Sequence, residues 1–118
     1  MAKTYVDLIN AGQYAMAADL FGADAVLLEP TGHAADGLAE IRSFYETIIG
    51  RMKPEIIAVA YLGDDTDYMV ELATKKQVNG EARFVLVSID HFTLGADGKI
   101  ARMIAFSRPP AASTTMAA

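Results

Sequence analysis

Residues 84–94 constrain the fold of this chain more than any other stretch. They read Phe-Val-Leu-Val-Ser-Ile-Asp-His-Phe-Thr-Leu, rich in β-branched and aromatic residues, and predict a long strand. Successive side chains of a strand point to opposite faces, so Asp90 shares one face with Phe84, Leu86, Ser88, Phe92 and Leu94. The other face carries Val85, Val87, Ile89, His91 and Thr93. Because both faces are mainly apolar, we expect both to be covered.

Asp90 is the exception in this apolar strand. An unpaired carboxylate in such surroundings is costly, so the group needs either partners or a proton. Two interpretations stay open at this point. Asp90 is a buried carboxylate bonded by backbone N–H groups, or it is a neutral carboxylic acid that donates a hydrogen bond inside a pocket.

The size and charge of the chain narrow its class. Its 118 residues, of which 53% are hydrophobic, suffice for one domain with a core. The net charge is −5, so the chain does not have the excess of basic residues that nucleic-acid binding needs. No apolar run approaches the roughly 20 residues of a membrane span, and no signal peptide is evident, so we expect a soluble, cytoplasmic protein. The chain has no cysteine and two widely separated histidines, and we expect no metal and no cofactor.

The first half of the chain is patterned as helix. Residues 3–21 have helical spacing that is interrupted at Asn10-Ala11-Gly12, with Phe21 on the apolar face of the second helix. A short strand at 25–29 ends before Pro30, and 31–37 form a loop. Residues 38–52 predict an amphipathic helix whose buried stripe is Ile41, Phe44, Tyr45, Ile48, Ile49 and Met52.

The second half is patterned as strands, at 55–62, 68–78, 81–94 and 100–108. Asn79-Gly80 is a strong hairpin signal. Helices followed by an antiparallel meander predict an α+β fold, in which helices cover one face of a curved sheet and enclose a pocket. We assign residues 1–110 to a single domain and 111–118 to a frayed tail.

Three polar side chains fall where the pattern predicts cover: Tyr5, Glu29 and Asp90. Taken singly, Tyr5 reads as a core aromatic with its hydroxyl at the rim, and Glu29 reads as an exposed strand end. A phenol and two carboxyl groups that face one pocket would instead be a catalytic site. Local sequence leaves both interpretations open.

The chain resembles the Δ5-3-ketosteroid isomerases, within the NTF2-like, SnoaL-like group of cone-shaped folds. The resemblance rests on these segments: Tyr5-Val6, Asn10-Ala11-Gly12, Leu20-Phe21, Glu29-Pro30, Ile41-Arg42, Phe44-Tyr45, Ile89-Asp90-His91-Phe92 and Gly98-Lys99-Ile100. It runs nearly end to end, and the Ile-Asp-His-Phe segment is its most specific part. It implies N-terminal helices packed on a strongly curved, mainly antiparallel sheet that encloses an apolar pocket.

The resemblance also implies roles for individual residues. Tyr5 and a protonated Asp90 match the family's oxyanion-hole donors, Glu29 matches its general base, and Tyr45 matches the tyrosine bonded to the catalytic one. The implied activity is a steroid Δ5-Δ4 isomerase that moves a β,γ double bond into conjugation by proton transfer through a dienolate. The family's base is an aspartate, so Glu29 is a departure whose extra methylene can misplace the carboxylate.

The remaining expectations concern the substrate and partners. The partner is a small apolar substrate, and candidate pocket walls are Phe21, Tyr45, Phe44, Phe84, Leu86, Phe92 and Met103. We expect a homodimer, by resemblance, through the apolar face of Val85, Val87 and Ile89. The alternatives are a binding protein of the same fold for an apolar ligand, or another pocket enzyme such as a polyketide cyclase or an epoxide hydrolase.

Overall fold

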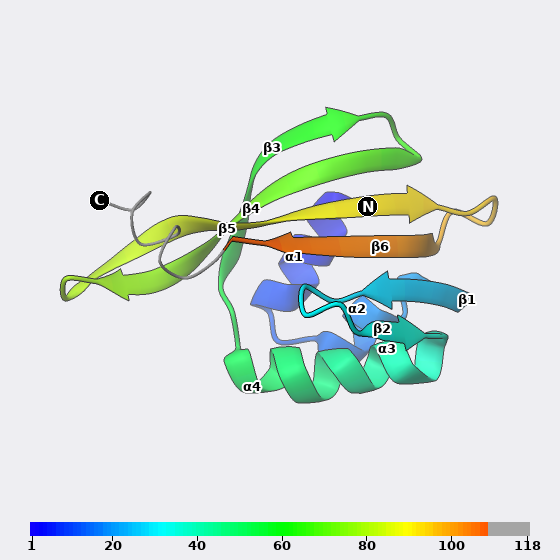
Figure 1. Ribbon diagram of the computed structural model, residues 1–118, viewed down its shortest axis with the longest axis horizontal. Helices are drawn as coiled ribbons and strands as arrows, with labels where there is room; N and C mark the ends of the chain where they lie inside the picture. Colours follow the sequence, from blue (N-terminus) through cyan, green and yellow to red (C-terminus); the bar gives the residue numbers. More distant parts are fainter. Residues whose placement is uncertain (109–118) are drawn as a thin grey trace.

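The computed structural model describes residues 1–108 as a six-stranded sheet with helices packed against it (Figure 1). The helical segments are α1 (Ala2–Asn10), α2 (Tyr14–Ala18), α3 (Leu38–Phe44), the π-helical η1 (Tyr45–Ile49) and α4 (Gly50–Met52). The strands are β1 (Phe21–Leu28), β2 (Ala34–Asp36), β3 (Ile56–Gly63), β4 (Asp67–Val78), β5 (Glu81–Leu94) and β6 (Ile100–Ser107). The α+β architecture expected from the sequence is confirmed. The tail expected at 111–118 lies outside the described residues.

The strand order is β2-β1-β6-β5-β4-β3, and β1 and β6 run parallel while the other neighbours are antiparallel. Figure 1 shows the helices from α3 to α4 running alongside β1 and β2, while the hairpin of β4 and β5 extends beyond the rest. The core lies between the helices and the inner face of the sheet, where Leu27, Met103, Phe92 and Tyr68 are buried on neighbouring strands. This inner face is the one that positions the site.

The hairpin predicted at Asn79-Gly80 is confirmed. Both residues have positive φ, 52° at Asn79 and 82° at Gly80, as a two-residue type I′ turn requires. The turn sets the pairing of β4 with β5, which runs from Val78 opposite Glu81 at the turn to Asp67 opposite Thr93 at the far end. Local turn chemistry therefore establishes the register of the longest ladder in the described sheet.

The segment around Phe21 differs from the expectation. Phe21 begins β1 instead of lying on a helix, because it pairs with Ile100 of β6 and the Leu20 carbonyl accepts from the Ile100 N–H at 2.9 Å. The loop expected at 31–37 contains β2, whose Ala34 pairs with Leu28 of β1. Both differences arise from hydrogen bonds to strands that the local pattern does not specify.

The helix predicted at 38–52 forms over that whole span, yet its middle is the π-helical η1. A π turn closes i→i+5 hydrogen bonds and inserts an extra residue, which rotates the side chains that follow. Ile41 and Tyr45 are fully buried as expected, whereas Ile48 is 44% exposed and Met52 is 64% exposed. The predicted buried stripe is therefore wrong at Ile48 and Met52, whereas Ile49 is partly buried against the core.

The alternation predicted for 84–94 holds from Ser88 to Leu94 but is wrong for 84–86. The pairing of β4 with β5 shifts at Leu72, so that β5 carries one extra residue, Val87. The extra residue reverses the alternation, so that side chains before the bulge point to the opposite face from the one that the uninterrupted pattern predicts. Val85 is consequently buried, while Phe84 is 41% exposed on the face opposite Asp90.

Candidate functional site

A buried pair of tyrosines joins α1 to η1. The hydroxyl groups of Tyr5 and Tyr45 lie 2.7 Å apart, and the Tyr45 hydroxyl also donates to the Met103 sulfur at 3.5 Å. Burial is the main reason that the pKa of each phenol is raised. For Tyr5, the charge of Asp90 raises the pKa further. For Tyr45, the neighbouring Tyr5 raises the pKa further, followed by Asp90. Both hydroxyl groups are therefore protonated and available as donors at neutral pH.

The helix that carries Tyr5 is fixed to the sheet at its C-terminal end. The Asn10 side chain donates to the Ile56 carbonyl at 2.8 Å and accepts from the Ile56 N–H at 2.7 Å. These two bonds join α1 to the start of β3. Together with the burial of Tyr5 and Ile9, they hold the phenol at a defined place on the inner face.

Asp90 lies on the inner face of β5 and is 4% exposed. Its cross-strand neighbours are Val70 on β4 and Ala105 on β6, both apolar. No residue among 1–108 donates a hydrogen bond to its carboxyl group, so the interpretation of a carboxylate satisfied by backbone N–H groups finds no support. Burial raises the pKa of Asp90 to about 7. The group is therefore largely protonated below neutral pH and has an O–H to donate.

Aromatic side chains enclose the tyrosine pair. The Phe92 ring, two residues beyond Asp90, packs edge-on to the Tyr5 ring at a centroid distance of 5.3 Å. The Phe21 ring lies 5.8 Å from that of Tyr45. Phe21, Phe92 and Met103 are all buried around the pair. A hydrogen bond formed in such surroundings is stronger than the same bond in water.

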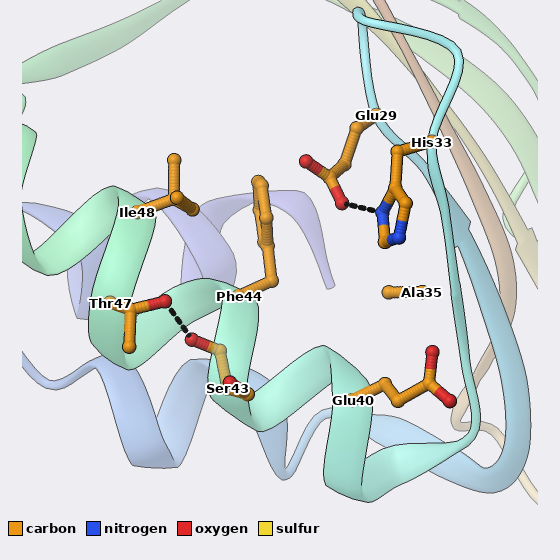
Figure 2. Close-up of a pocket in the computed structure, with 8 residues that line it drawn as sticks. All are labelled: Glu29, His33, Ala35, Glu40, Ser43, Phe44, Thr47 and Ile48. Atoms are coloured by element: carbon orange, nitrogen blue, oxygen red, sulfur yellow. Dashed lines mark hydrogen bonds and ion pairs between the residues drawn. The ribbon is translucent and has the colours of Figure 1, made fainter.

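Glu29 lies at a pocket of about 350 Å³ between the end of β1 and the helix from α3 to η1 (Figure 2). Its side chain is 14% exposed, and its Oε2 lies 2.6 Å from Nδ1 of His33. The remaining lining residues are Ala35, Glu40, Ser43, Phe44, Thr47 and Ile48. Neither Tyr5 nor Asp90 lines this pocket, so the three predicted catalytic residues do not share one described cavity.

Phe44 lies between this pocket and the tyrosine pair. It lines the pocket beside Glu29, and its ring packs edge-on to the Tyr45 ring at 5.2 Å. Figure 2 shows the Glu29 carboxyl group on the side of the pocket that faces Phe44.

The sheet register relates Glu29 to Asp90. Leu28 pairs with Ile104, so the next residue, Glu29, falls beside Ala105, the cross-strand neighbour of Asp90. Residues in one such row share a face of the sheet. The two acids are two strands apart, a Cα separation of roughly 10 Å from the usual spacing between strands.

Two other predicted walls lie elsewhere. The bulge at Val87 puts Leu86 and Phe84 on the face opposite Asp90, and Phe84 contributes to the exposed surface. The structure therefore does not bring either residue to the inner face. His91, on the face opposite Asp90, lies 2.6 Å from Asp67 through its Nε2.

Sequence reasoning missed two contacts of the site, those of His33 with Glu29 and of Tyr45 with Met103. His33 lies in the loop predicted at 31–37, and its side chain is 68% exposed although it bonds the candidate base. Its position four residues after Glu29, across a turn that contains Pro30 and Gly32, is a weak signal that this contact could form. No local signal points to Met103, which β6 brings beside Tyr45.

A model of the SnoaL-like domain matches residues 2–103. The chain belongs to the SnoaL-like domain family. A steroid Delta-isomerase of Nocardioides simplex is 32% identical to the chain over 107 residues, which are 89% of this chain and 85% of that protein. The family and this relative together make the chain a pocket enzyme or binding protein of the NTF2-like superfamily.

Solved structures support the fold of this SnoaL-like domain. An epoxide hydrolase/cyclase-like enzyme of salinomycin pyran ring formation, SalBIII, superposes with a TM-score of 0.73 at 22% identity, over 91% of this chain and 87% of that one. An NTF2-like protein of unknown function from Burkholderia xenovorans gives 0.73 at 17% identity, over 92% and 80%. These likenesses identify an NTF2-like fold.

Within residues 1–108, no helix is long and apolar enough to cross a bilayer.

Proposed function

We propose that this SnoaL-like domain is a steroid Δ5-Δ4 isomerase. The observation that carries the proposal is Asp90, a buried acid without a bonded partner in the described chain, whose pKa is raised to about 7. A binding protein has no need to keep a neutral acid beside two buried phenols. The steroid Delta-isomerase relative at 32% identity supports the same reaction.

In the proposed reaction, a Glu29 oxygen removes a proton from the carbon between the ketone and the double bond. The C–H electrons form the dienolate, and negative charge develops on the ketone oxygen. Tyr5 and protonated Asp90 donate hydrogen bonds to that oxygen, in a buried site where preorganised donors are most effective. Glu29 then returns the proton two carbons further along, and the double bond becomes conjugated. The same group accepts and returns the proton, so nothing is consumed.

Tyr45 has a defined part in this proposal. Its hydroxyl is within reach of two acceptors, the Tyr5 oxygen at 2.7 Å and the Met103 sulfur at 3.5 Å. When Tyr5 donates to the dienolate oxygen, Tyr45 can donate to Tyr5 by rotation of its O–H bond alone. This second donor supports the charge that Tyr5 shares, and Met103 is the weaker acceptor for Tyr45.

The direct test is to add 5-androstene-3,17-dione to the purified protein and follow the rise in conjugated-enone absorbance. We expect catalytic turnover. The matched control is the Asp90→Leu variant. Comparing its rate with that of the wild-type chain corrects for background isomerisation and non-specific catalysis. Saturable binding of the steroid without turnover by the wild-type chain would indicate the binding-protein alternative.

Replacing Tyr5 with phenylalanine should lower kcat more than it changes KM. The variant keeps the ring that packs against Phe92 and removes the donor to the dienolate oxygen. Loss of one such donor typically costs about 100-fold to 1,000-fold in kcat. Steady-state kinetics measure the effect, and Tyr14→Phe, on α2, is the control for loss of a phenol outside the site. Equal losses in the two variants would contradict the role of Tyr5.

We also propose that the chain is a homodimer through the outer face of the sheet. Val85, which we expected in this interface, is buried within the chain, so the proposed surface comprises the exposed, cross-strand-paired Ile89 and Phe106 together with Met69. Sedimentation velocity should give a dimer for the wild-type chain and a shift toward monomer for Phe106→Asp. A wild-type monomer at micromolar concentration would contradict this proposal.

A further inference from the structure

A tight turn after β1 brings His33 back beside Glu29. The Glu29 N–H donates to the His33 carbonyl at 2.8 Å, and the Gly32 N–H donates to the Glu29 carbonyl at 2.9 Å. Gly32 has a φ of 91°, a conformation that favours glycine. With its backbone closed in this way, the turn holds the two side chains together, and Nδ1 of His33 lies 2.6 Å from Oε2 of Glu29.

We propose that His33 is a positioning residue for Glu29, an inference that rests on the isomerase proposed above. Glutamate has one more rotatable bond than the aspartate that the isomerase family places at this position, and that freedom costs rate if the carboxylate is misplaced. The imidazole fixes Oε2. Figure 2 shows the other carboxyl oxygen pointing away from the ring, toward the side of Phe44. One oxygen is thus held and the other is free to take the proton.

The exposure of the two groups fits this division of roles. The carboxyl-bearing side chain of Glu29 is 14% exposed, whereas that of His33 is 68% exposed. The imidazole is therefore the outer member of the pair, and the carboxylate is the inner one that reaches the pocket. His33 keeps its proton on Nδ1 throughout, because the proton that moves between the two substrate carbons travels on the free oxygen of Glu29.

Kinetics of paired variants test the inference. With 5-androstene-3,17-dione, His33→Ala should lower kcat by about tenfold to 100-fold and leave KM nearly unchanged, since misplacing a base affects the chemical step. His33→Asn should restore most of the loss, because the Asn amide nitrogen can occupy the place of Nδ1. The matched control is His91→Asn, which removes the imidazole bonded to Asp67 at the same 2.6 Å distance on the outer face. It should leave kcat unchanged.

A second measurement does not depend on activity. Long-range ¹H–¹⁵N NMR at alkaline pH should show neutral His33 with its proton on Nδ1, because the bonded carboxylate selects that tautomer. In Glu29→Ala the proton should move to Nε2. His91, bonded through Nε2, should show the Nε2 tautomer in both proteins and so provides an internal reference.

The outcomes separate the two proposals. A wild-type chain without turnover overturns the isomerase function, and with it the role of His33 in that reaction. An active wild-type chain with an equally active His33→Ala variant overturns this inference alone. The positioning role of His33 is also overturned if His33→Asn is as slow as His33→Ala. The same holds if the His33 proton stays on the same ring nitrogen in Glu29→Ala as in wild type.

Discussion

Replacing Glu29 with glutamine is expected to lower kcat by about 1,000-fold, within the range that a general base contributes. Glutamine has nearly the same shape, and its amide oxygen can still accept from His33, but it cannot take a proton from carbon. Binding of a phenol or steroid analogue should persist, because Tyr5 and Asp90 remain. Steady-state kinetics and a fluorescence titration with a phenolic steroid measure the two effects.

Glu40→Gln is the matched control for the base. Glu40 lines the same pocket as Glu29, and its Oε1 accepts from the Asp36 N–H at 3.1 Å. Its loss removes a negative charge from the pocket without touching the proposed chemistry, so turnover should be unchanged. Wild-type turnover in Glu29→Gln would mean that the base is assigned wrongly. Equal losses in both variants would mean that pocket charge matters, rather than one carboxylate.

Replacing Asp90 with leucine is expected to lower kcat by about 100-fold to 1,000-fold, the usual effect of losing one oxyanion donor. Leucine has the same branched side-chain skeleton and suits the apolar neighbours Val70 and Ala105, so the fold should be retained. Kinetics measure the loss, and circular dichroism checks the fold. Undiminished turnover would show that the neutral acid has no part in the reaction.

The same acid should make stability depend on pH. The pKa of Asp90 is raised from its ordinary 3.8 to about 7 in the folded chain. Between these values the folded state binds the proton and the unfolded state does not, so the free energy of unfolding falls as pH rises. The group's contribution should decrease by roughly 4 kcal/mol from pH 4 to above pH 7. Asp90→Asn, measured by urea unfolding, should lack this decrease and be more stable than wild type at pH 8.

The difference in the free energy of unfolding between wild type and Asp90→Asn isolates the contribution of Asp90, because the other titratable groups are common to both proteins. If wild type and Asp90→Asn lose stability in parallel as pH rises, the carboxyl group is already ionised in the folded chain. That result would remove the observation that supports the isomerase.

Elements whose signals are local could be predicted from the sequence. The Asn79-Gly80 turn requires positive φ at both positions, which these residues accept readily, so local sequence predicts the hairpin and the strands that flank it. The break at Gly12 and the helix that begins at Leu38 are predictable as well, from a helix-ending glycine and from the spacing of apolar residues. The burial of Asp90 was also predicted, because alternation along one strand places it among apolar neighbours.

The parts that depend on distant residues could not be predicted in the same way. The parallel pairing of β1 with β6 converts Phe21 from helix to strand, and β2 forms only because it pairs with β1. The bulge at Val87 depends on how β5 fits β4, so no local pattern indicates that Phe84 faces away from Asp90.

The amino-acid sequence by itself determined the class of fold, the extent of the long hairpin and the presence of a buried acid on an apolar strand. These follow from the spacing of side chains within one element, which each segment carries on its own. The resemblance implied the bond between Tyr5 and Tyr45, 40 residues apart, whereas only the tertiary structure decided that Met103 lies beside them and that His33 contacts Glu29. Such contacts depend on where separate elements come to rest against one another, and packing of the whole chain sets those positions.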